Sequence, residues 1–212
     1  MNLRWRLAQW GELRWWRAYL GKTGHGDYLA RKRAYWQRVL ADAGIHPPAG
    51  SSVLDAGCGP AGIFIALDDC RVDALDPLLD QYRQYFDFFK PARFPHVRFL
   101  SQPLETLDTA QKYDYVFCLN AINHVDKLSE ALDRLCAALA PGGILVLSVD
   151  VHRYAMLKYI FRLFQADLLH PHQHDKADYA AMLAEKSLDI RSSRLLKKGR
   201  VFDYVLFVVK NR

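Results

Sequence analysis

The sequence lacks any long hydrophobic run. Its longest apolar stretches, Gly142–Val149 and Tyr204–Val209, have the length of a β-strand, whereas a membrane-spanning helix needs ~20 apolar residues. The arginine-containing N-terminus is not followed by the apolar core of roughly 7–15 residues that a secretory signal requires. These two absences lead us to expect a chain with neither a membrane span nor a secretory signal.

Cysteine is also scarce. The four cysteines, Cys58, Cys70, Cys118 and Cys136, form no C-x-x-C pair, which excludes a zinc knuckle or a thioredoxin-type motif. We expect reduced, buried thiols and a cytoplasmic location.

Positive charge is unevenly distributed along the 212 residues. The first forty residues hold nine of the 29 Lys and Arg residues but only two of the 23 Asp and Glu residues. All five tryptophans lie in the same segment. The basic, indole-rich character therefore belongs to the N-terminal segment, and the rest of the chain is nearly neutral.

From Ser51 onward, short apolar runs alternate with amphipathic stretches. Such alternation is typical of an α/β fold built from βαβ units around a mostly parallel sheet. The expected strands are Val53–Ala56, Val72–Leu75, Val97–Leu100, Tyr113–Leu119 and Ile144–Val149, and the expected helices are Ile63–Leu67, Pro77–Lys90, Lys127–Ala140, Val151–Leu169 and Lys176–Lys186. The stretches Leu188–Leu196 and Val201–Val209 have hairpin spacing, so one late strand should be antiparallel.

The segment His46–Gly50, rich in proline and glycine, is the clearest joint in the chain. We therefore divide the chain into an N-terminal helical lid segment (1–48) and a sheet domain (49–212). Six apolar residues of the first segment recur at three- and four-residue steps and predict one helical stripe: Leu3, Leu7, Trp10, Leu13, Trp16 and Leu20. We favour a lid that packs on the sheet domain. Peripheral contact with the anionic inner face of a membrane and nucleic-acid binding remain alternatives.

The strongest motif is a glycine-rich turn after an apolar strand, in the run VLDAGCGPAG from Val53 to Gly62. Gly57 and Gly59 allow tight-turn torsions and a close approach of a ligand to the backbone. Asp76 follows at the end of the next strand, where an acid can accept hydrogen bonds from a ribose diol. This arrangement predicts a nucleoside-containing cofactor. Asp55, directly before the turn, favours a cationic group such as a sulfonium over a pyrophosphate.

The sequence here resembles the class I S-adenosylmethionine-dependent methyltransferases. The blocks VLDAGCGP, LDP at Asp76, YDYVFCLNAINHV and LAPGGILVLSV occur in the order seen in that family, between Ser51 and Val149. The resemblance implies a Rossmann-like, seven-stranded, mostly parallel sheet with a C-terminal antiparallel hairpin, and S-adenosyl-L-methionine as the cofactor. The chain departs from the family at Ala61, which replaces a glycine after Pro60.

The resemblance also implies roles for individual residues. Asp55, Gly57 and Gly59 would face the methionine and ribose parts of the cofactor. Asp76 would hold the ribose hydroxyls, and Pro77 would lie under the adenine.

Further positions follow from the same resemblance. Gln102, Pro103 and Leu104 would flank the adenine, and Asn120 would lie near the methyl group. The family often has an acid in the adenine-flanking stretch, which here would be Glu105. Tyr28 and Lys32, one helical turn apart, would meet the carboxylate of the cofactor.

Missing motifs direct the acceptor towards a small molecule. The segment after the fourth strand, Asn120–Asn123, lacks the proline and aromatic pattern of nucleic-acid amine methyltransferases. The sequence has no Pro-Cys pair for attack on a pyrimidine, and no paired glutamates for arginine methylation.

The candidate catalytic bases are histidines that follow predicted strands. His124 comes after the fourth strand and His152 after the fifth. The cluster His170–His174 fits a solvated turn better than a metal site. The aromatic-rich stretch Val151–Leu169 suggests an apolar or aromatic acceptor, methylated at oxygen or nitrogen.

Two other functions remain open. The literal G-x-G-x-x-G match permits an NAD(P)-dependent oxidoreductase. A non-catalytic binding protein on the same fold is the second alternative.

Overall fold

The computed structural model describes residues 3–23, 28–153, 174–186, 188–199 and 201–211. Seven strands form one sheet in the order β3-β2-β1-β4-β5-β7-β6. The strands are β1 (Ser52–Ala56), β2 (Arg71–Leu75), β3 (Val97–Leu100), β4 (Tyr113–Leu119), β5 (Leu139–His152), β6 (Asp189–Lys197) and β7 (Phe202–Lys210). The described α-helices are α1 (Leu3–Thr23), α2 (Tyr28–Ala43), α3 (Leu79–Tyr85), α4 (Leu128–Ala138) and α6 (Lys176–Glu185).

The sheet is parallel from β3 to β5, and β7 runs antiparallel to both β5 and β6. The predicted seven-stranded, mostly parallel sheet with a C-terminal antiparallel hairpin is therefore confirmed. The hairpin strands each lie one residue further along the chain than expected.

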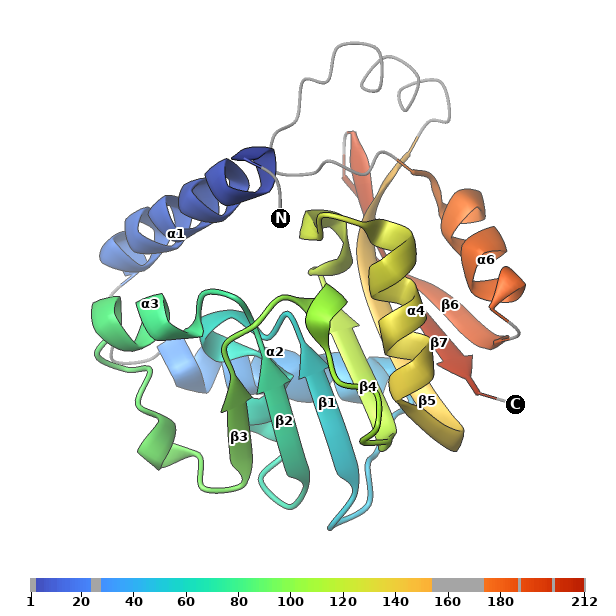
Figure 1. Ribbon diagram of the computed structural model, residues 1–212, viewed down its shortest axis with the longest axis horizontal. Coiled ribbons are helices and arrows are strands. Elements are labelled where there is room, and N and C mark those ends of the chain that lie inside the picture. The colour runs from blue at the N-terminus through green and yellow to red at the C-terminus, as the bar shows by residue number, and fades with distance from the viewer. Residues whose placement is uncertain (1–2, 24–27, 154–173, 187, 200, 212) are drawn as a thin grey trace.

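Helices cover both faces of the sheet (Figure 1), with α2 behind it and α4 and α6 in front. Because successive side chains of a strand point to opposite faces, β1 contributes Val53 to the core on the α2 side and Leu54 to the core on the α4 side. Helix α1 lies across the carboxyl ends of the parallel strands (Figure 1). The layers leave that end of the sheet as the place where a ligand can meet several strand ends.

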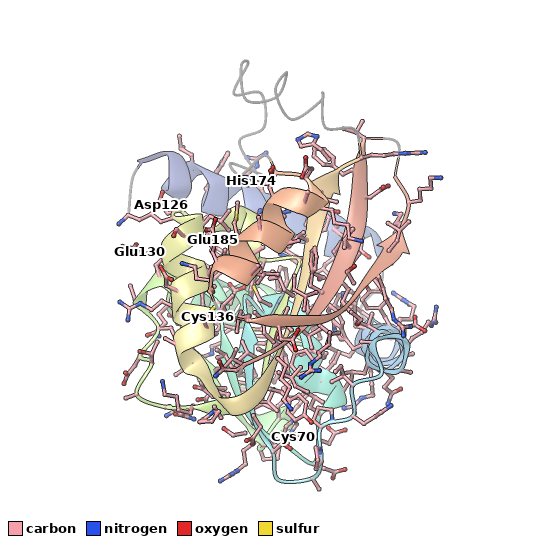
Figure 2. All side chains as sticks on the ribbon, turned by 90° about the vertical axis from the view of Figure 1, so that its right-hand side faces the viewer. Cys70, Asp126, Glu130, Cys136, His174 and Glu185 are labelled. Atoms are coloured by element: carbon pink, nitrogen blue, oxygen red, sulfur yellow. The ribbon has the colours of Figure 1, made fainter. Side chains whose placement is uncertain are left out.

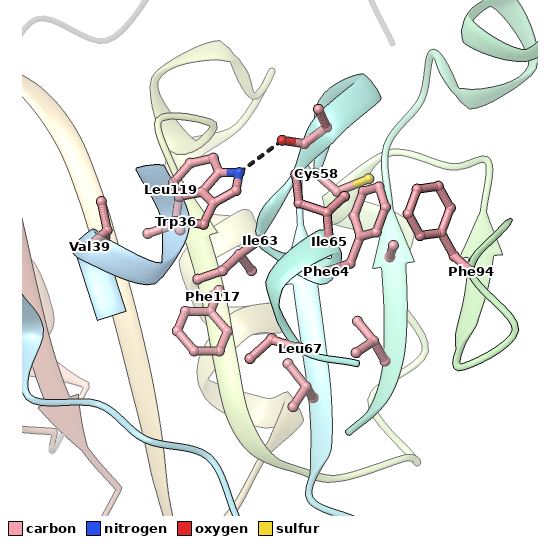
Figure 3. Close-up of a cluster of buried hydrophobic side chains, with 14 of the residues drawn as sticks. Trp36, Val39, Cys58, Ile63, Phe64, Ile65, Leu67, Phe94, Phe117 and Leu119 are labelled. Atoms are coloured by element: carbon pink, nitrogen blue, oxygen red, sulfur yellow. Dashed lines mark hydrogen bonds between the residues drawn. The ribbon is translucent and has the colours of Figure 1, made fainter. Parts of the chain in front are cut away.

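Helix α2 packs into the core on its side of the sheet. Trp36, Val39 and Leu40 are buried there, and the indole Nε1 of Trp36 donates a hydrogen bond of 2.9 Å to the carbonyl oxygen of Ala61 (Figure 3). The division of the chain at residue 48 stays a prediction. Helix α2 precedes residue 48, yet its buried residues belong to the same hydrophobic core as residues of β1.

Two predicted helices are shorter than expected. Pro77–Lys90 forms only the short helix α3, because Oδ1 of Asp76 accepts a hydrogen bond from the N–H of Leu78 and holds the chain in a turn. At its other end Phe86 is extended, and the following aromatic residues are buried at spacings that do not fit one helical face. Ile63–Leu67 forms a 3₁₀ turn, η2 (Ile63–Ala66), in place of an α-helix.

Strand β5 is longer than expected at both ends. Helix α4 stops at Ala138 because Leu139 is already extended and pairs with Tyr113, so Pro141 lies within the irregular start of the strand and does not end the helix. At the other end, Val151 and His152 pair with β7 and are not helical. The rest of the predicted helix Val151–Leu169, from residue 154 onward, lies outside the described residues.

The predicted apolar stripe of α1 is wrong at two positions. Leu13, Trp16 and Leu20 pack against the core, whereas Leu7 is 48% and Trp10 59% exposed. Leu7 and Leu13 are six residues apart, and at 100° per residue their side chains point about 120° apart around the helix. A stripe built from repeated three-residue steps therefore leaves the buried face.

The four cysteines are free thiols, and Figure 2 shows Cys70 and Cys136 well apart. Within the described ranges, no three His, Cys, Asp or Glu side chains form a potential metal site. Of the predicted histidine cluster only His174 is described, and its Nδ1 lies 3.5 Å from Oδ2 of Asp178. Among the described helices, none combines the length and the apolar character that crossing a membrane requires.

Candidate functional site

The glycine turn after β1 forms the floor of the site. Gly57 has a φ of 73°, and its backbone N–H and that of Cys58 donate to the carbonyl of Leu75 at the end of β2 (2.7 and 3.1 Å). A Cβ at Gly57 would overlap the Cβ of Ala121, which comes from the loop after β4. The absence of a side chain therefore lets the β1 and β4 loops meet at one edge of the sheet.

Asp76 fixes the turn from the neighbouring strand. Its carboxylate accepts hydrogen bonds from the backbone N–H groups of Gly59 (2.9 Å) and Leu78 (2.8 Å). Burial raises the pKa of Asp76 to about 6, against the lowering effect of these N–H groups. A carboxylate has about four acceptor positions, so two remain for a ligand.

Asp55 lies beneath the turn. Its Oδ2 accepts a hydrogen bond of 3.1 Å from the N–H of Phe64, and a Cβ at Gly62 would overlap this carboxylate. Burial, opposed by that N–H group, raises the pKa of Asp55 to about 7. The glycine at position 62, one place later than in the resembled family, therefore makes room for Asp55.

A cavity of about 480 Å³ opens at the carboxyl ends of the strands. This volume lies within the ~300–1,000 Å³ typical of small-molecule sites. The predicted site residues that line it are Gly57, Gly59, Asp76, Pro77, Pro103, Leu104, Asn120, Lys32 and His124. Four other predicted site residues do not line it: Asp55, Gln102, Tyr28 and His152.

His152 and Tyr28 are buried and do not line the cavity. The ring of His152, in β5, lies 4.7 Å from that of Phe202, measured between centroids. The ring of Tyr28 packs edge-on against Phe88 at 5.1 Å. Both side chains thus contribute to aromatic packing.

Asn120 has a strained backbone at the edge of the cavity. Its φ of 55° is the only positive value for a non-glycine residue in the described part of the chain. Its N–H donates to the carbonyl (3.0 Å) and Oγ (3.1 Å) of Ser148, and that hydroxyl lies 2.6 Å from the hydroxyl of Tyr204. Strain of this kind costs about 1–3 kcal/mol and is typical of functional sites.

Lys32 brings a cation to the cavity from α2. Its Nζ lies 4.6 Å from the ring centroid of Trp36 and 5.1 Å from that of Tyr35, which are cation–π distances. Burial lowers the pKa of Lys32, and the charge of Asp55 opposes this shift.

Sequence reasoning predicted an N-terminal lid but named no residue of α1 as a site residue. Gln9, Glu12, Trp15 and Trp16 line it. Three of them, at positions 9, 12 and 16, share the face of the helix that carries the packed residues Leu13 and Leu20. The sole acid of the helix, on the face that carries the packed leucines, was the available signal.

Glu105 also lines the cavity, although its carboxylate has a structural role. Its Oε1 accepts hydrogen bonds from the N–H groups of Asp126 (2.7 Å) and Lys127 (3.2 Å), just before α4. One oxygen of the acid in the adenine-flanking stretch is therefore used in a loop contact.

The strand order, the glycine turn and the acid after β2 define a Rossmann-like α/β protein with a nucleoside-type site. The chain belongs to the methyltransferase domain family, whose family model matches residues 28–192. This match confirms the predicted membership of the S-adenosylmethionine-dependent methyltransferases. The matched segment begins at the first residue of α2.

Known proteins show the same relationship. The chain is 25% identical over 163 residues to a ubiquinone biosynthesis O-methyltransferase of Rickettsia conorii, a match that covers 71% of this chain and 54% of that protein. Two relatives of the same name from Rickettsia bellii are 29% identical over 45% of this chain and 40% of theirs. The chain thus spans about half the length of the curated relatives it matches.

Among solved structures, the chain is similar to magnesium protoporphyrin IX methyltransferase from Synechocystis PCC 6803, which contains bound S-adenosylhomocysteine. The TM-score is 0.65 at 21% identity, and the match covers 95% of this chain and 94% of that one. The YcgJ protein of Bacillus subtilis gives a TM-score of 0.68 at 13% identity, over 84% of this chain and 97% of its own. At these identities the likeness shows the fold.

Proposed function

We propose that this protein transfers the methyl group of S-adenosylmethionine to a hydroxyl oxygen of a small, apolar or aromatic acceptor. The observation that carries the proposal is the cavity at the glycine turn, lined by Asp76 and Lys32, in a chain of the methyltransferase domain family. The relatives named ubiquinone biosynthesis O-methyltransferase support an oxygen acceptor. A nitrogen acceptor is the alternative that the product analysis below would reveal.

The residues present fit this cofactor. Asp76 has free acceptor positions for the ribose hydroxyls, and Lys32 supplies a cation for the carboxylate of the methionine part. The turn at Gly57 keeps side chains away from the backbone that the cofactor approaches. When bound, S-adenosylmethionine would supply a methyl group on a sulfonium; an acceptor oxygen would bond to the methyl carbon in line with the breaking C–S bond, and S-adenosylhomocysteine would be the leaving group.

The chain contributes alignment and proton removal. Holding two reactants in line can lower the activation free energy by roughly 7–11 kcal/mol. A hydroxyl acceptor must also lose its proton, and His124 lines the cavity beside Asn120. His124 accepts this proton, whereas His152 is buried against Phe202 and does not line the cavity.

Product analysis tests the function. The purified protein is incubated with S-adenosylmethionine carrying a labelled methyl group and a panel of phenols, catechols and aromatic amines. We expect S-adenosylhomocysteine and a methyl ether to form, and His124→Gln to lower kcat at least tenfold with little change in S-adenosylhomocysteine affinity. His96→Gln, a histidine outside the cavity lining, is the matched control. Binding of a nicotinamide dinucleotide and none of S-adenosylhomocysteine would contradict the proposal.

The outer side of α1 adds a second contact, with an anionic membrane surface. Leu7 and Trp10 are exposed there, and the guanidinium of Arg14 lies 4.7 Å from the ring centroid of Trp10. Indoles combined with arginines on one helix suit the boundary between headgroups and acyl chains. This surface favours an acceptor that partitions into lipid, and the small-molecule cavity disfavours nucleic acid as a substrate.

A further inference from the structure

The inner face of α1 brings an acid to the cavity that Asp76 also lines. Gln9, Glu12 and Trp16 line the same cavity as Asp76. Glu12 is the sole acid in the 21 residues of α1. A carboxyl group placed on the buried face of a helix needs a partner, because burying it without one is costly.

The surroundings of Glu12 are mostly acidic or neutral. Burial first, and the charge of Asp76 second, raise the pKa of Glu12 to about 8, while a hydrogen bond with the side chain of Trp16 opposes the shift. Tyr82, in α3, has a pKa that is raised by burial and by the charges of Asp76 and Glu12. The remaining titratable groups of the cavity lining are Cys58, Lys32, Glu105 and His124.

At neutral pH the pair therefore holds one proton. Burial raises the pKa of both carboxyls, and the charge of Asp76 adds to the shift at Glu12, so the two groups share this proton. A ligand that donates hydrogen bonds to both carboxyls favours the doubly ionised pair, because a hydrogen bond to a charged acceptor is about twice as strong as one to a neutral acceptor.

Gln9 provides an independent sign that this face binds a donor-bearing ligand. Its amide oxygen is buried, and within the described part of the chain it has no hydrogen-bond partner. A buried polar atom without a partner costs about 1–3 kcal/mol. An unpaired acceptor one turn from Glu12, on the lining of the cavity, is what a ligand with hydroxyl donors would satisfy.

We propose that Glu12 is a cofactor-binding residue, whose carboxylate accepts a hydrogen bond from a ribose hydroxyl beside Asp76, with Gln9 as a second acceptor on α1. The inference rests on the proposed function, since the ribose comes with S-adenosylmethionine. It makes α1 part of the binding site. It also couples binding to the release of one proton, so affinity rises with pH up to about 8.

Calorimetric titrations test this between pH 6 and pH 9. The ligands are S-adenosylhomocysteine, adenosine, which does not titrate in this range, and 2′,3′-dideoxyadenosine, which lacks the hydroxyls. For the unmodified protein we expect adenosine affinity to rise by no more than tenfold per pH unit and to level off above pH 8, with release of a proton to the buffer. Glu12→Gln should weaken adenosine binding at pH 8 several-fold, flatten the profile above pH 7 and leave dideoxyadenosine binding unchanged.

Two further variants complete the experiment. Glu130→Gln, on the exposed side of α4, is the matched control and should behave as the unmodified protein. Glu12→Asp keeps the charge and should restore part of the pH dependence, which a purely structural role would not predict. If adenosine affinity depends on pH in the same way in Glu12→Gln and in the unmodified protein, the inference is overturned, whereas the proposed cofactor is unaffected. Failure of the unmodified protein to bind S-adenosylhomocysteine overturns the proposed function, and the inference with it.

Discussion

The close approach of Gly57 to Ala121 allows a quantitative test of the turn that forms the site. Gly57 has a φ of 73°, and a Cβ there would overlap that of Ala121. A left-handed conformation costs a residue with a side chain roughly 1–2 kcal/mol. Forcing an extra methyl group into a packed contact costs about 1–3 kcal/mol. We therefore expect Gly57→Ala to lower the free energy of unfolding by about 2–5 kcal/mol.

Two control variants separate these contributions. Gly50 has a φ of 79°, but a Cβ added there would have no neighbour within 4 Å, so Gly50→Ala should cost only the roughly 1–2 kcal/mol of the left-handed backbone. Adding Ala121→Gly to Gly57→Ala removes the overlap and should recover the other part. The coupling energy of the double-mutant cycle should then be about 1–3 kcal/mol, because the two residues are in direct contact.

The measurement is urea unfolding followed by circular dichroism, with S-adenosylhomocysteine titration of each folded variant. The free energies can be compared only if their slopes against urea concentration are equal in all variants. A Gly57→Ala variant as stable as Gly50→Ala, or a double variant in which Ala121→Gly gives no recovery, would contradict this prediction. Either result would mean that the β1 and β4 loops move apart at little cost and that their contact does not shape the cavity.

Four further predictions follow from named contacts. Asp76→Ala should weaken S-adenosylhomocysteine binding by about 1.5–3 kcal/mol in calorimetry, and it should also destabilise the fold, because two buried N–H groups lose their acceptor. Trp36→Phe should lower the free energy of unfolding by about 1–3 kcal/mol in urea, since the Ala61 carbonyl loses its donor, whereas Trp10→Phe, on an exposed side chain, should change it little. Burial raises the pKa of Glu12 from 4.5 to about 8, so the ligand-free folded state retains a proton that the unfolded state releases. The free energy of unfolding of the ligand-free protein should therefore fall as the pH rises from about 5 to 8. Glu12→Gln should make this pH dependence less steep. Trp10→Ala should reduce co-sedimentation of the protein with anionic vesicles. Salt should weaken vesicle binding of the unmodified protein, because charges beyond about 8 Å are screened at physiological ionic strength. Vesicle binding that neither change affects would contradict membrane contact by α1.

The parts of the site that could be predicted from the sequence are those encoded locally. A strand, a glycine turn and an acid at the next strand end lie within one short stretch from Val53 to Asp76, and the structure brings Gly57, Gly59 and Asp76 to the cavity. The parallel direction of most strands followed from the same alternation of elements. These features depend on torsional freedom and on strand connectivity, which act between near neighbours.

The parts that could not be predicted depend on contacts between distant elements. Glu12 reaches the cavity because α1 crosses the carboxyl end of the sheet, and no pattern within α1 indicates its direction. Pro141 lies in a strand because Leu139 pairs with Tyr113, a tertiary contact that overrides a local signal for the end of a helix. The aromatic residues that follow α3 were predicted to be helical but are not, for a similar reason, because their rings are buried in the core.

The hydrogen bonds of the turn decide between the two nucleoside cofactors that the glycine pattern alone permits. In a dinucleotide site, the pyrophosphate binds free N–H groups at the N-terminus of an α-helix. Here the turn continues into two 3₁₀ turns, η1 (Gly59–Ala61) and η2 (Ile63–Ala66), and provides no α-helix start. The N–H groups of Gly59 and Phe64 already donate to Asp76 and Asp55. A pyrophosphate would therefore meet carboxyl groups where it needs donors, whereas a cofactor with ribose hydroxyls and a cationic sulfur would meet acceptors and negative charge.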